Sequence, residues 1–276
     1  MTSIALAASE SAPTAELSAK DGSVRYGDKV RLSGAVPGIA GAQVQIAYKR
    51  NGSGTWRPVR KAETDPAGQY STRVRPPASG AFRAQAEGGE PTSEVPVQVR
   101  SVTKLRVSKH VVVGHKVKVK GTVQPGVAGR EVKLSLPGGD ERTKTRTGGK
   151  FAATWKPRST GHGKVRAAAR GDMVASASRS GARKVIVYRP AEASYYGPGL
   201  YGNGLACGGT LNPGTIGVAH KTMPCGTKLT LRHAGRSVNV RVIDRGPFVA
   251  GREFDLTAAT KNRLRFGSTG TVLSSR

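Results

Sequence analysis

An internal repeat constrains the fold of this chain more than any other feature of its sequence. Segment 24–48, VRYGDKVRLSGAVPGIAGAQVQIAY, is similar to segment 111–136, VVVGHKVKVKGTVQPGVAGREVKLSL. The matching residues include Gly27 with Gly114, Gly34 with Gly121, PGIAG at 37–41 with PGVAG at 125–129, and Gly68, Tyr70 and Pro76 with Gly149, Phe151 and Pro157. A period of roughly 85 residues is too long for a solenoid unit, so the repeat indicates a duplicated domain.

Apolar and polar residues alternate within each copy. The alternating apolar positions are Val30, Leu32, Val44, Ile46 and Tyr48 in the first copy, and Val117, Val119, Val132, Leu134 and Leu136 in the second. Short alternating runs separated by Gly and Pro turns are typical of antiparallel β-sandwiches. The pattern resembles the bacterial immunoglobulin-like modules of exported surface proteins, and it predicts one sandwich at 16–100 and a second at 101–189.

Neither copy contains an arrangement of residues that is typical of a catalytic site. Trp56 and Trp155 fit core or edge anchors better than platforms for sugar rings. His110, His115 and His162 have no Cys or carboxylate ligands near them in the sequence, so we expect no metal site.

The positive charge of the chain is concentrated in the second copy. The 276 residues include 45 Lys and Arg against 17 Asp and Glu, a net charge of +28, and residues 101–190 hold 21 against 4, a net of +17. Such a concentration predicts a polyanionic neighbour, namely nucleic acid, anionic lipid or an acidic wall polymer. The alternative is a solvated basic surface.

The lysines of the second copy fall on the polar phase of its strands. Lys116, Lys118 and Lys120 would share one solvent face of a sandwich and bind phosphate groups through salt-sensitive contacts. Because this face offers few aromatic residues for base stacking, nucleic acid fits it less well than an anionic wall polymer. We therefore predict electrostatic adhesion to such polymers through residues 101–189.

The N-terminal segment 1–15 resembles the end of an incomplete export signal. Its apolar run at 4–8 is short and no basic residue precedes Lys20, but Ala8 and Ala12 resemble a cleavage region. We expect the segment to be disordered. No apolar run approaches the roughly 18–20 residues that span a bilayer, so the sequence predicts an exported chain without a transmembrane segment.

The C-terminal part, from Ala191, has a different pattern. Runs 229–231 and 238–243 alternate as strands around a hairpin at 233–236. The second strand would place Asp244 at its end, where the turn RGP at 245–247 stops the ladder. A carboxylate at a strand end faces a cleft more often than a core.

Two further residues have both a structural and a functional interpretation. Asp255 precedes a predicted helix at 256–264, where it would be either the N-cap or a residue that contacts substrate. His220 follows a predicted strand at 216–219 and would be either a hydrogen-bonded structural histidine or a residue of the site.

Cys207 and Cys225 are the only cysteines, and they are 18 residues apart. In an export-like chain such a pair favours a disulfide. Closing this loop would contribute about 3 kcal/mol. A nucleophilic thiol would instead need a paired base and a reducing compartment.

Five motifs of the C-terminal part occur together in one known family: ASYYG at 193–197, VAHKT at 218–222, CGT at 225–227, VIDRGP at 242–247 and FDLT at 254–257. In this order they make residues 190–276 resemble the double-psi β-barrel of the rare lipoprotein A family of peptidoglycan-active proteins, and also the first domain of expansins. The expected fold is therefore all-β: two immunoglobulin-like β-sandwiches followed by a C-terminal six-stranded double-psi β-barrel. We expect a secreted, wall-associated monomer that binds peptidoglycan glycan strands and needs no cofactor or metal.

The resemblance also implies an activity, lytic transglycosylation. One carboxylic acid protonates the leaving glycosidic oxygen, and its carboxylate then helps the C6 hydroxyl of the sugar to close a 1,6-anhydro ring. Asp244 matches the catalytic aspartate of the family, Asp255 its second acidic position and His220 its groove histidine. The acid must be protonated at rest, so its pKa should be raised by burial or by a second carboxylate. The residues expected to contact the sugars are Tyr195, Tyr196, Tyr201 and Arg245.

Two departures from the family pattern leave the activity open. Gly209 stands where active members carry a glutamate, and Tyr195 replaces the usual tryptophan. The retained Asp244, Asp255 and His220 favour an enzyme, whereas Gly209 favours a non-catalytic, expansin-like module that binds glycan and loosens the wall. A nucleic-acid-binding protein is a third hypothesis, supported by charge alone.

Overall fold

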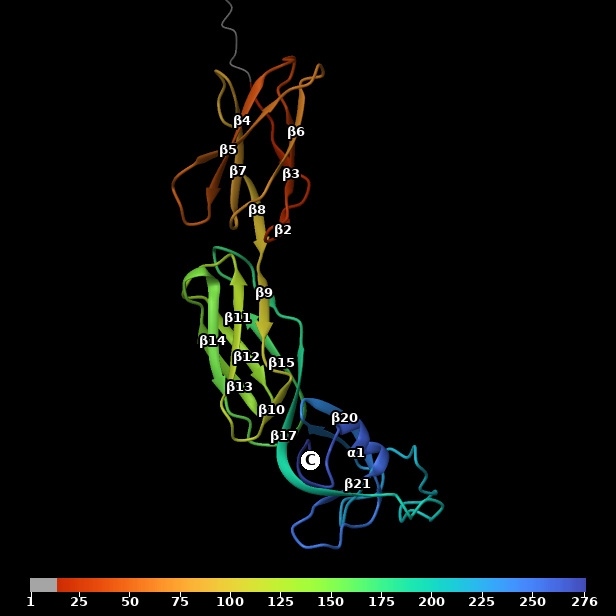
Figure 1. Cartoon of the computed structure of the whole chain (residues 1–276). Coiled ribbons are helices and arrows are strands. Elements are labelled where there is room, and N and C mark those ends of the chain that lie inside the picture. The colour runs from red at the N-terminus through yellow and green to blue at the C-terminus, as the bar shows by residue number, and fades with distance from the viewer. Residues whose placement is uncertain (1–13) are drawn as a thin grey trace, which may run out of the picture.

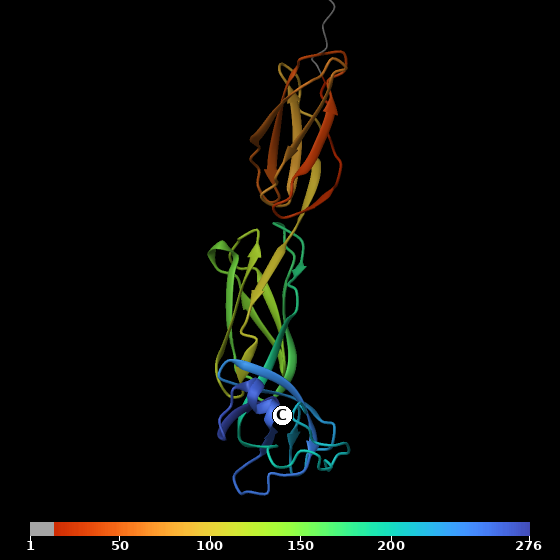
Figure 2. The same cartoon turned by 45° about the vertical axis from the view of Figure 1, so that its right-hand side comes forward.

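The computed structural model describes residues 14–276 as three consecutive β-rich parts, arranged one after another along the molecule (Figures 1 and 2). The predicted export segment 1–15 lies outside the described residues except for its last two. Ala15 is one of these, and it is buried in the core of the first part. In the described part of the chain, no helix is long and apolar enough to cross a membrane.

The first part consists of two sheets that enclose one core. The strands of one sheet are β1 (Ser18–Ala19), β3 (Val30–Ala35) and β6 (Gln69–Val74), in the order β1-β3-β6. Those of the other are β2 (Ser23–Arg25), β8 (Val95–Arg100), β7 (Gly80–Ala86), β4 (Gln43–Arg50) and β5 (Arg57–Glu63), in the order β2-β8-β7-β4-β5. The alternating residues Val30, Leu32, Val44 and Ile46 are fully buried between the two sheets, which is consistent with an immunoglobulin-like sandwich.

The second part repeats this plan. One sheet has the order β14-β11-β9, from β14 (Lys150–Trp155), β11 (Val117–Gln124) and β9 (Val102–Arg106), with a short 3-10 helix, η1 (Thr147–Gly149), before β14. The facing strands are β13 (Gly139–Lys144), β12 (Glu131–Leu136), β15 (Gly161–Ala169), β16 (Ser178–Arg179), β10 (His110–Val112) and β17 (Arg183–Tyr196). Trp155 lies in this core, as predicted, whereas Trp56 of the first part is half-buried between Lys49 and Arg83.

The repeated glycines and aromatic residues occupy equivalent positions in the two parts. Gly34 of β3 pairs with Tyr70 of β6, and Gly121 of β11 pairs with Phe151 of β14. A Cβ on Gly121 would overlap the Phe151 ring and the backbone oxygen of Lys104. The glycine and aromatic residues that match between the two copies therefore pack against each other, with the aromatic ring covering the glycine on the neighbouring strand.

Strand β17 connects the second part to the third without interruption. Its first half pairs with β10 and β15, and its second half pairs with β21 (Phe254–Thr257) and β22 (Thr269–Ser274). The hydrophobic core changes along it, from the cluster that contains Val185 and Val187 to the cluster that contains Ala191 and Ala193. One strand therefore serves both cores.

The third part is a closed barrel. Within the described residues its six strands are the second half of β17, β18 (Val218–Ala219), β19 (Lys228–His233), β20 (Arg236–Asp244), β21 and β22. They follow the order β17-β21-β18-β20-β19-β22, and β22 pairs back onto β17 to close the ring. The predicted hairpin is present, since His233 pairs with Arg236. The helix α1 (Ala258–Leu264) begins two residues later than predicted.

Candidate active site

Four residues on four adjacent strands lie at one level of the barrel. Asp244 of β20 pairs with Ala219 of β18, Ala219 pairs with Asp255 of β21, and Asp255 pairs with Ser194 of β17. Residues that pair directly across strands project their side chains to the same face of a sheet. The two aspartates predicted from the sequence are therefore brought to one face, on either side of a small alanine.

A β-bulge at Ile243 makes this arrangement possible. Val218 pairs with Val242, but the next residue, Ala219, pairs with Asp244, so Ile243 is an extra residue in β20. Without the bulge Asp244 would follow Val242 onto the core face, because alternate residues of a strand share a face. Gly217 accommodates the bulge, since a Cβ at this position would overlap the Ile243 side chain.

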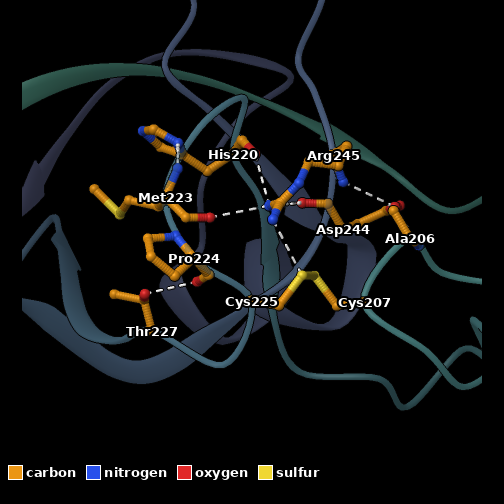
Figure 3. The surroundings of a disulfide bond; sticks show 9 residues. All are labelled: Ala206, Cys207, His220, Met223, Pro224, Cys225, Thr227, Asp244 and Arg245. Atoms are coloured by element: carbon orange, nitrogen blue, oxygen red, sulfur yellow. Dashed lines mark hydrogen bonds between the residues drawn. A yellow bond between two sulfur atoms is a disulfide. The ribbon is translucent and has the colours of Figure 1, made fainter.

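Two backbone amides fix the Asp244 carboxylate. Its Oδ1 accepts hydrogen bonds from the N–H groups of Ala206 and Arg245, both at 2.9 Å (Figure 3). The disulfide between Cys207 and Cys225, which the sequence predicted, lies beside this contact. Cys207 N–H also donates to the backbone oxygen of Ile243 at 3.2 Å. The segment that orients Asp244 is thus tied both to the bulge and to the loop before β19.

Asp255 has the electrostatic character expected of an acid. Burial raises the pKa of its carboxyl, and the charge of Asp244 raises it further, while the Ser194 hydroxyl and Arg252 act in the opposite direction. Its Oδ1 is buried and has no hydrogen-bond partner of standard geometry among the described residues. The N-cap interpretation of Asp255 is wrong: Asp255 lies within β21, and Thr257 caps α1 by accepting a hydrogen bond from Thr260 N–H.

The three predicted tyrosines lie in different places. Tyr196 shares the face of Ser194, and burial together with the charges of Asp244 and Asp255 raises the pKa of its hydroxyl. Tyr195, one residue earlier, packs against the barrel core, with Lys261 Nζ 4.3 Å from its ring centroid. Tyr201 is 40% exposed in the loop that follows β17. Only Tyr196 lies beside the two aspartates.

His220 is joined to Asp244 through its backbone rather than its ring. Its N–H donates to the Asp244 backbone oxygen at 3.2 Å. The ring Nδ1 accepts from the N–H groups of Thr222 and Met223 at 3.1 and 2.9 Å. In Figure 3 the ring points away from the Asp244 carboxylate. Hydrogen bonds of this kind support the structural interpretation of His220.

Glu253 is a residue of this region that the sequence reasoning missed. Its carboxylate binds Arg189 of β17 in a bidentate pair, at 2.7 and 2.5 Å, and its Oε1 lies 3.7 Å from His220 Nε2. Burial lowers the pKa of His220, and Glu253 partly offsets this effect. The only signal in the sequence was its position two residues before Asp255, next to a motif already identified.

The Arg245 guanidinium organises the loop between β18 and β19. Its Nη1 donates to the backbone oxygens of His220 and Met223 at 3.3 and 3.0 Å, and its Nη2 lies 3.1 Å from Cys225 Sγ. Figure 3 shows these contacts converging on one guanidinium. Since these donors are used within the protein, the geometry supports a positioning role for Arg245.

Gly209 belongs to a tight turn. Leu205 N–H donates to the Gly209 oxygen at 2.9 Å, and Gly208 N–H donates back to the Leu205 oxygen at 2.8 Å. Gly208 and Gly209 have φ of +91° and +82°, in the region that favours glycine. A Cβ on Gly209 would meet no atom within 4 Å, so a side chain there would have space but a strained backbone.

Comparison with known proteins identifies the barrel. Residues 192–273 match the family model described as "Lytic transglycolase". The chain is 44% identical over 80 residues to a probable endolytic peptidoglycan transglycosylase RlpA of Synechocystis, and 42% identical over 82 residues to the endolytic peptidoglycan transglycosylase RlpA of Campylobacter jejuni. It is 41% identical over 82 residues to the protein of the same name from Pseudomonas aeruginosa.

These matches concern one part of each protein. They cover 28%, 29% and 29% of this chain, and 25%, 30% and 24% of the three relatives. A solved structure of fibronectin(III)-like modules of Clostridium thermocellum CbhA covers 62% of the chain and 93% of that structure at 15% identity, with a TM-score of 0.24, which is too low to bear on the fold. Residues 192–273 are therefore an RlpA-like double-psi β-barrel domain, which follows two β-rich parts in this chain.

Proposed function

We propose that the barrel cleaves peptidoglycan glycan strands as a lytic transglycosylase, with Asp244 as the acid/base. The observation that carries this proposal is the pairing of Asp244 and Asp255 on either side of Ala219 in a domain that matches the lytic transglycolase model. The names of the relatives, endolytic peptidoglycan transglycosylases, support the same substrate and reaction.

The chemistry needs one proton and no water. The acid donates its proton to the glycosidic oxygen as the bond from that oxygen to C1 breaks. The resulting carboxylate then accepts the proton of the C6 hydroxyl as O6 forms a bond to C1. The products are a 1,6-anhydro sugar and a new chain end with a free hydroxyl, and the acid is regenerated. Unlike a hydrolase with two carboxylates in separate roles, this reaction uses a single group for both steps.

The surroundings of Asp244 suit this role. Two backbone amides hold Oδ1, which leaves Oδ2 available to a sugar oxygen. Burial raises the pKa of Asp255 and the charge of Asp244 raises it further, so a second negative charge on this face is costly. A carboxyl that retains its proton more readily than an isolated aspartate, that of Asp255, therefore lies on the same face as Asp244.

The alternative is a module that binds glycan without cutting it. Gly209 favours this function, because the turn at 205–209 carries no carboxylate where active relatives of the family are expected to have one. The same face, with Asp244, Asp255 and Tyr196, would then contact the sugars without transferring a proton.

Digestion of denuded peptidoglycan separates the two functions. With the intact chain we expect anhydro-muropeptides in the mass spectrum of the products, and we expect Asp244→Asn to abolish them while thermal unfolding and the disulfide stay unchanged. Asp28→Asn, at an exposed position of the first part, is the matched control and should keep the activity. If the intact chain pulls down sacculi but releases no anhydro products, the binding function is correct and the enzymatic one is wrong.

The location follows from the same proposal. A chain that acts on peptidoglycan works outside the cytoplasm, and the Cys207–Cys225 disulfide supports an oxidising compartment. The basic second part, in which Lys118 and Lys120 of β11 are exposed, would then adhere to anionic polymers of the wall.

A further inference from the structure

A cleft separates the second part of the chain from the barrel. It consists of two adjoining cavities of about 830 and 750 Å³, which share His162, Thr230 and Asn239 in their walls. One wall comes from β15 and β17 of the second part, and the other from β19 and β20 of the barrel. Neither Asp244 nor Asp255 is among the residues that line it.

The walls of this cleft carry basic side chains and no acidic ones. The cations that line it are Lys109, Lys164, Lys184, Lys228, Arg241 and Arg276. None of these six forms a salt bridge with the residues that the structure describes, and no Asp or Glu side chain is among the lining residues. The positive charge of the cleft is therefore not balanced by any side chain that lines it.

Four of these cations form two like-charged pairs, one on each wall. Lys164 of β15 lies directly opposite Lys184 of β17, and Lys228 of β19 lies directly opposite Arg241 of β20. Like charges at directly opposed positions destabilise a sheet. Two such pairs on one cleft do not stabilise the fold, and they indicate a binding site for anions.

Hydrogen bonds and a continuous strand hold the two walls in place. His162 Nε2 lies 3.0 Å from Thr230 Oγ1, which links β15 to β19 across the cleft. Thr230 Oγ1 in turn donates to Asn239 Oδ1 at 2.8 Å. Because β17 also runs from one wall into the barrel, the positions of the two cation pairs are set before a ligand binds.

The pKa of His110, at one end of the cleft, is sensitive to the positive potential of the cleft. His110 lines the cavity, and its Nδ1 lies 2.9 Å from the Tyr188 hydroxyl. Burial lowers the pKa of this ring, and the charges of Arg232 and Lys109 lower it further. A bound anion would act in the opposite direction, which makes His110 a probe for occupancy.

We infer that this cleft binds a linear phosphodiester polymer, with one phosphate at the Lys164–Lys184 pair and another at the Lys228–Arg241 pair. A phosphodiester shares one negative charge between two non-bridging oxygens, and each of these can accept a hydrogen bond from one cation of a pair. The lining residues include no Phe, Tyr or Trp, so the cleft offers no stacking surface for bases and favours units without rings, such as a polyol phosphate. This inference does not depend on whether the barrel cuts glycan.

The test measures binding of a poly(glycerol phosphate) chain to the full-length protein at several salt concentrations. Lys164→Gln/Lys184→Gln and Lys228→Gln/Arg241→Gln should each weaken binding about tenfold and reduce the salt dependence by about 0.7 in log–log slope per lost contact. Lys20→Gln/Lys61→Gln removes the same charge from exposed positions of the first part, outside the cleft, and should change binding little. The pKa of His110, followed by NMR, should rise on binding.

Three results would overturn the inference. Equal weakening by the control pair would show that the polymer responds only to the general charge of the chain. Tighter binding of poly-L-glutamate of equal charge, or of an oligothymidylate, would assign the cleft to carboxylates or to nucleic acid. Thermal unfolding of each variant checks its fold. Since the assay contains no peptidoglycan, its outcome is independent of glycan cleavage.

Discussion

Asp244 and Asp255 lie at the same level of the barrel, one on each side of Ala219, although β20 and β21 are not neighbours. Strand β18 has only two residues, so it contributes little more than the spacer between the two carboxyl groups. Burial raises the pKa of Asp255, and the charge of Asp244, acting across a single strand, raises it further. The pH dependence of stability follows from this relationship.

Asp255→Asn should make the barrel more resistant to unfolding as the pH rises. An acid whose pKa is raised on folding contributes stability that is fully present below its unfolded pKa, ordinarily 3.8, and is lost as the pH rises through the folded value. The asparagine does not ionise, so the variant should lose less stability above pH 4 than the natural chain. Urea unfolding from pH 3.5 to 7 measures this, with the exposed Asp21→Asn as control. Parallel curves for the two variants would contradict the prediction.

Glu253→Gln should lower the pKa of His220. Burial already lowers it, and the Glu253 carboxylate, 3.7 Å from Nε2, is the main group that acts in the opposite direction. Without that negative charge, Arg189 and Arg245 act on the ring uncompensated. NMR titration of the His220 ring checks the shift, and Glu192→Gln is the control, because that carboxylate accepts a hydrogen bond from Thr271 and does not contribute to the His220 pKa shift. An unchanged His220 pKa would show that the Glu253 charge is fully neutralised by Arg189.

Replacing both cysteines by serine should cost stability and disturb the site together. The disulfide closes an 18-residue separation, which corresponds to about 3 kcal/mol of unfolding free energy by loop entropy. It also anchors Cys207 beside Ala206, whose N–H holds Asp244 Oδ1. We therefore expect lower stability in urea and a reduced yield of anhydro-muropeptides at temperatures where the variant is still folded. Full activity in such a folded variant would show that the disulfide does not position Asp244.

Local sequence was a sufficient guide where a structural feature is set by neighbours in the chain. The hairpin between β19 and β20, the strand that ends at Asp244 and the pairing of Cys207 with Cys225 were all predicted. The all-β fold was predicted from the alternation of apolar and polar residues, and the barrel was predicted from the order of its five sequence motifs.

Other features depend on register between distant strands and were not predicted. The bulge at Ile243 has no signature of its own in the sequence, yet it decides which face Asp244 occupies. The Arg189–Glu253 pair joins residues 64 positions apart, and nothing local indicates that they meet. Asp255 was given two interpretations because a polar residue before a helix looks the same as one at a strand position, and only the pairing with Ala219 distinguishes them.

Gly121→Ala should destabilise the second part by about 2–3 kcal/mol, in the range typical of overpacking. The added Cβ would overlap the Phe151 ring and the Lys104 backbone oxygen, and a backbone atom cannot move aside without distorting β9 or β11. Gly181→Ala is the matched control, because a Cβ there meets no atom within 4 Å and its φ is not positive. Urea unfolding compares the two. Equal stability would mean that the glycine is not required by packing, and that the repeated match of Gly34 and Gly121 has another cause.

Gly209→Glu tests whether the missing carboxylate limits activity. A side chain at this position has open space, but φ of +82° costs a non-glycine residue about 1–2 kcal/mol. That strain falls on the turn at 205–209, next to the Ala206 amide that holds Asp244. If the natural chain lacks activity because it lacks this acid, the variant should release more anhydro-muropeptides despite a small loss of stability. Gly209→Gln carries the same strain without the charge, so a rise in the glutamate variant alone identifies the carboxylate as the cause. A fall in both variants would show that the turn requires glycine and that Asp244 works without a second acid there.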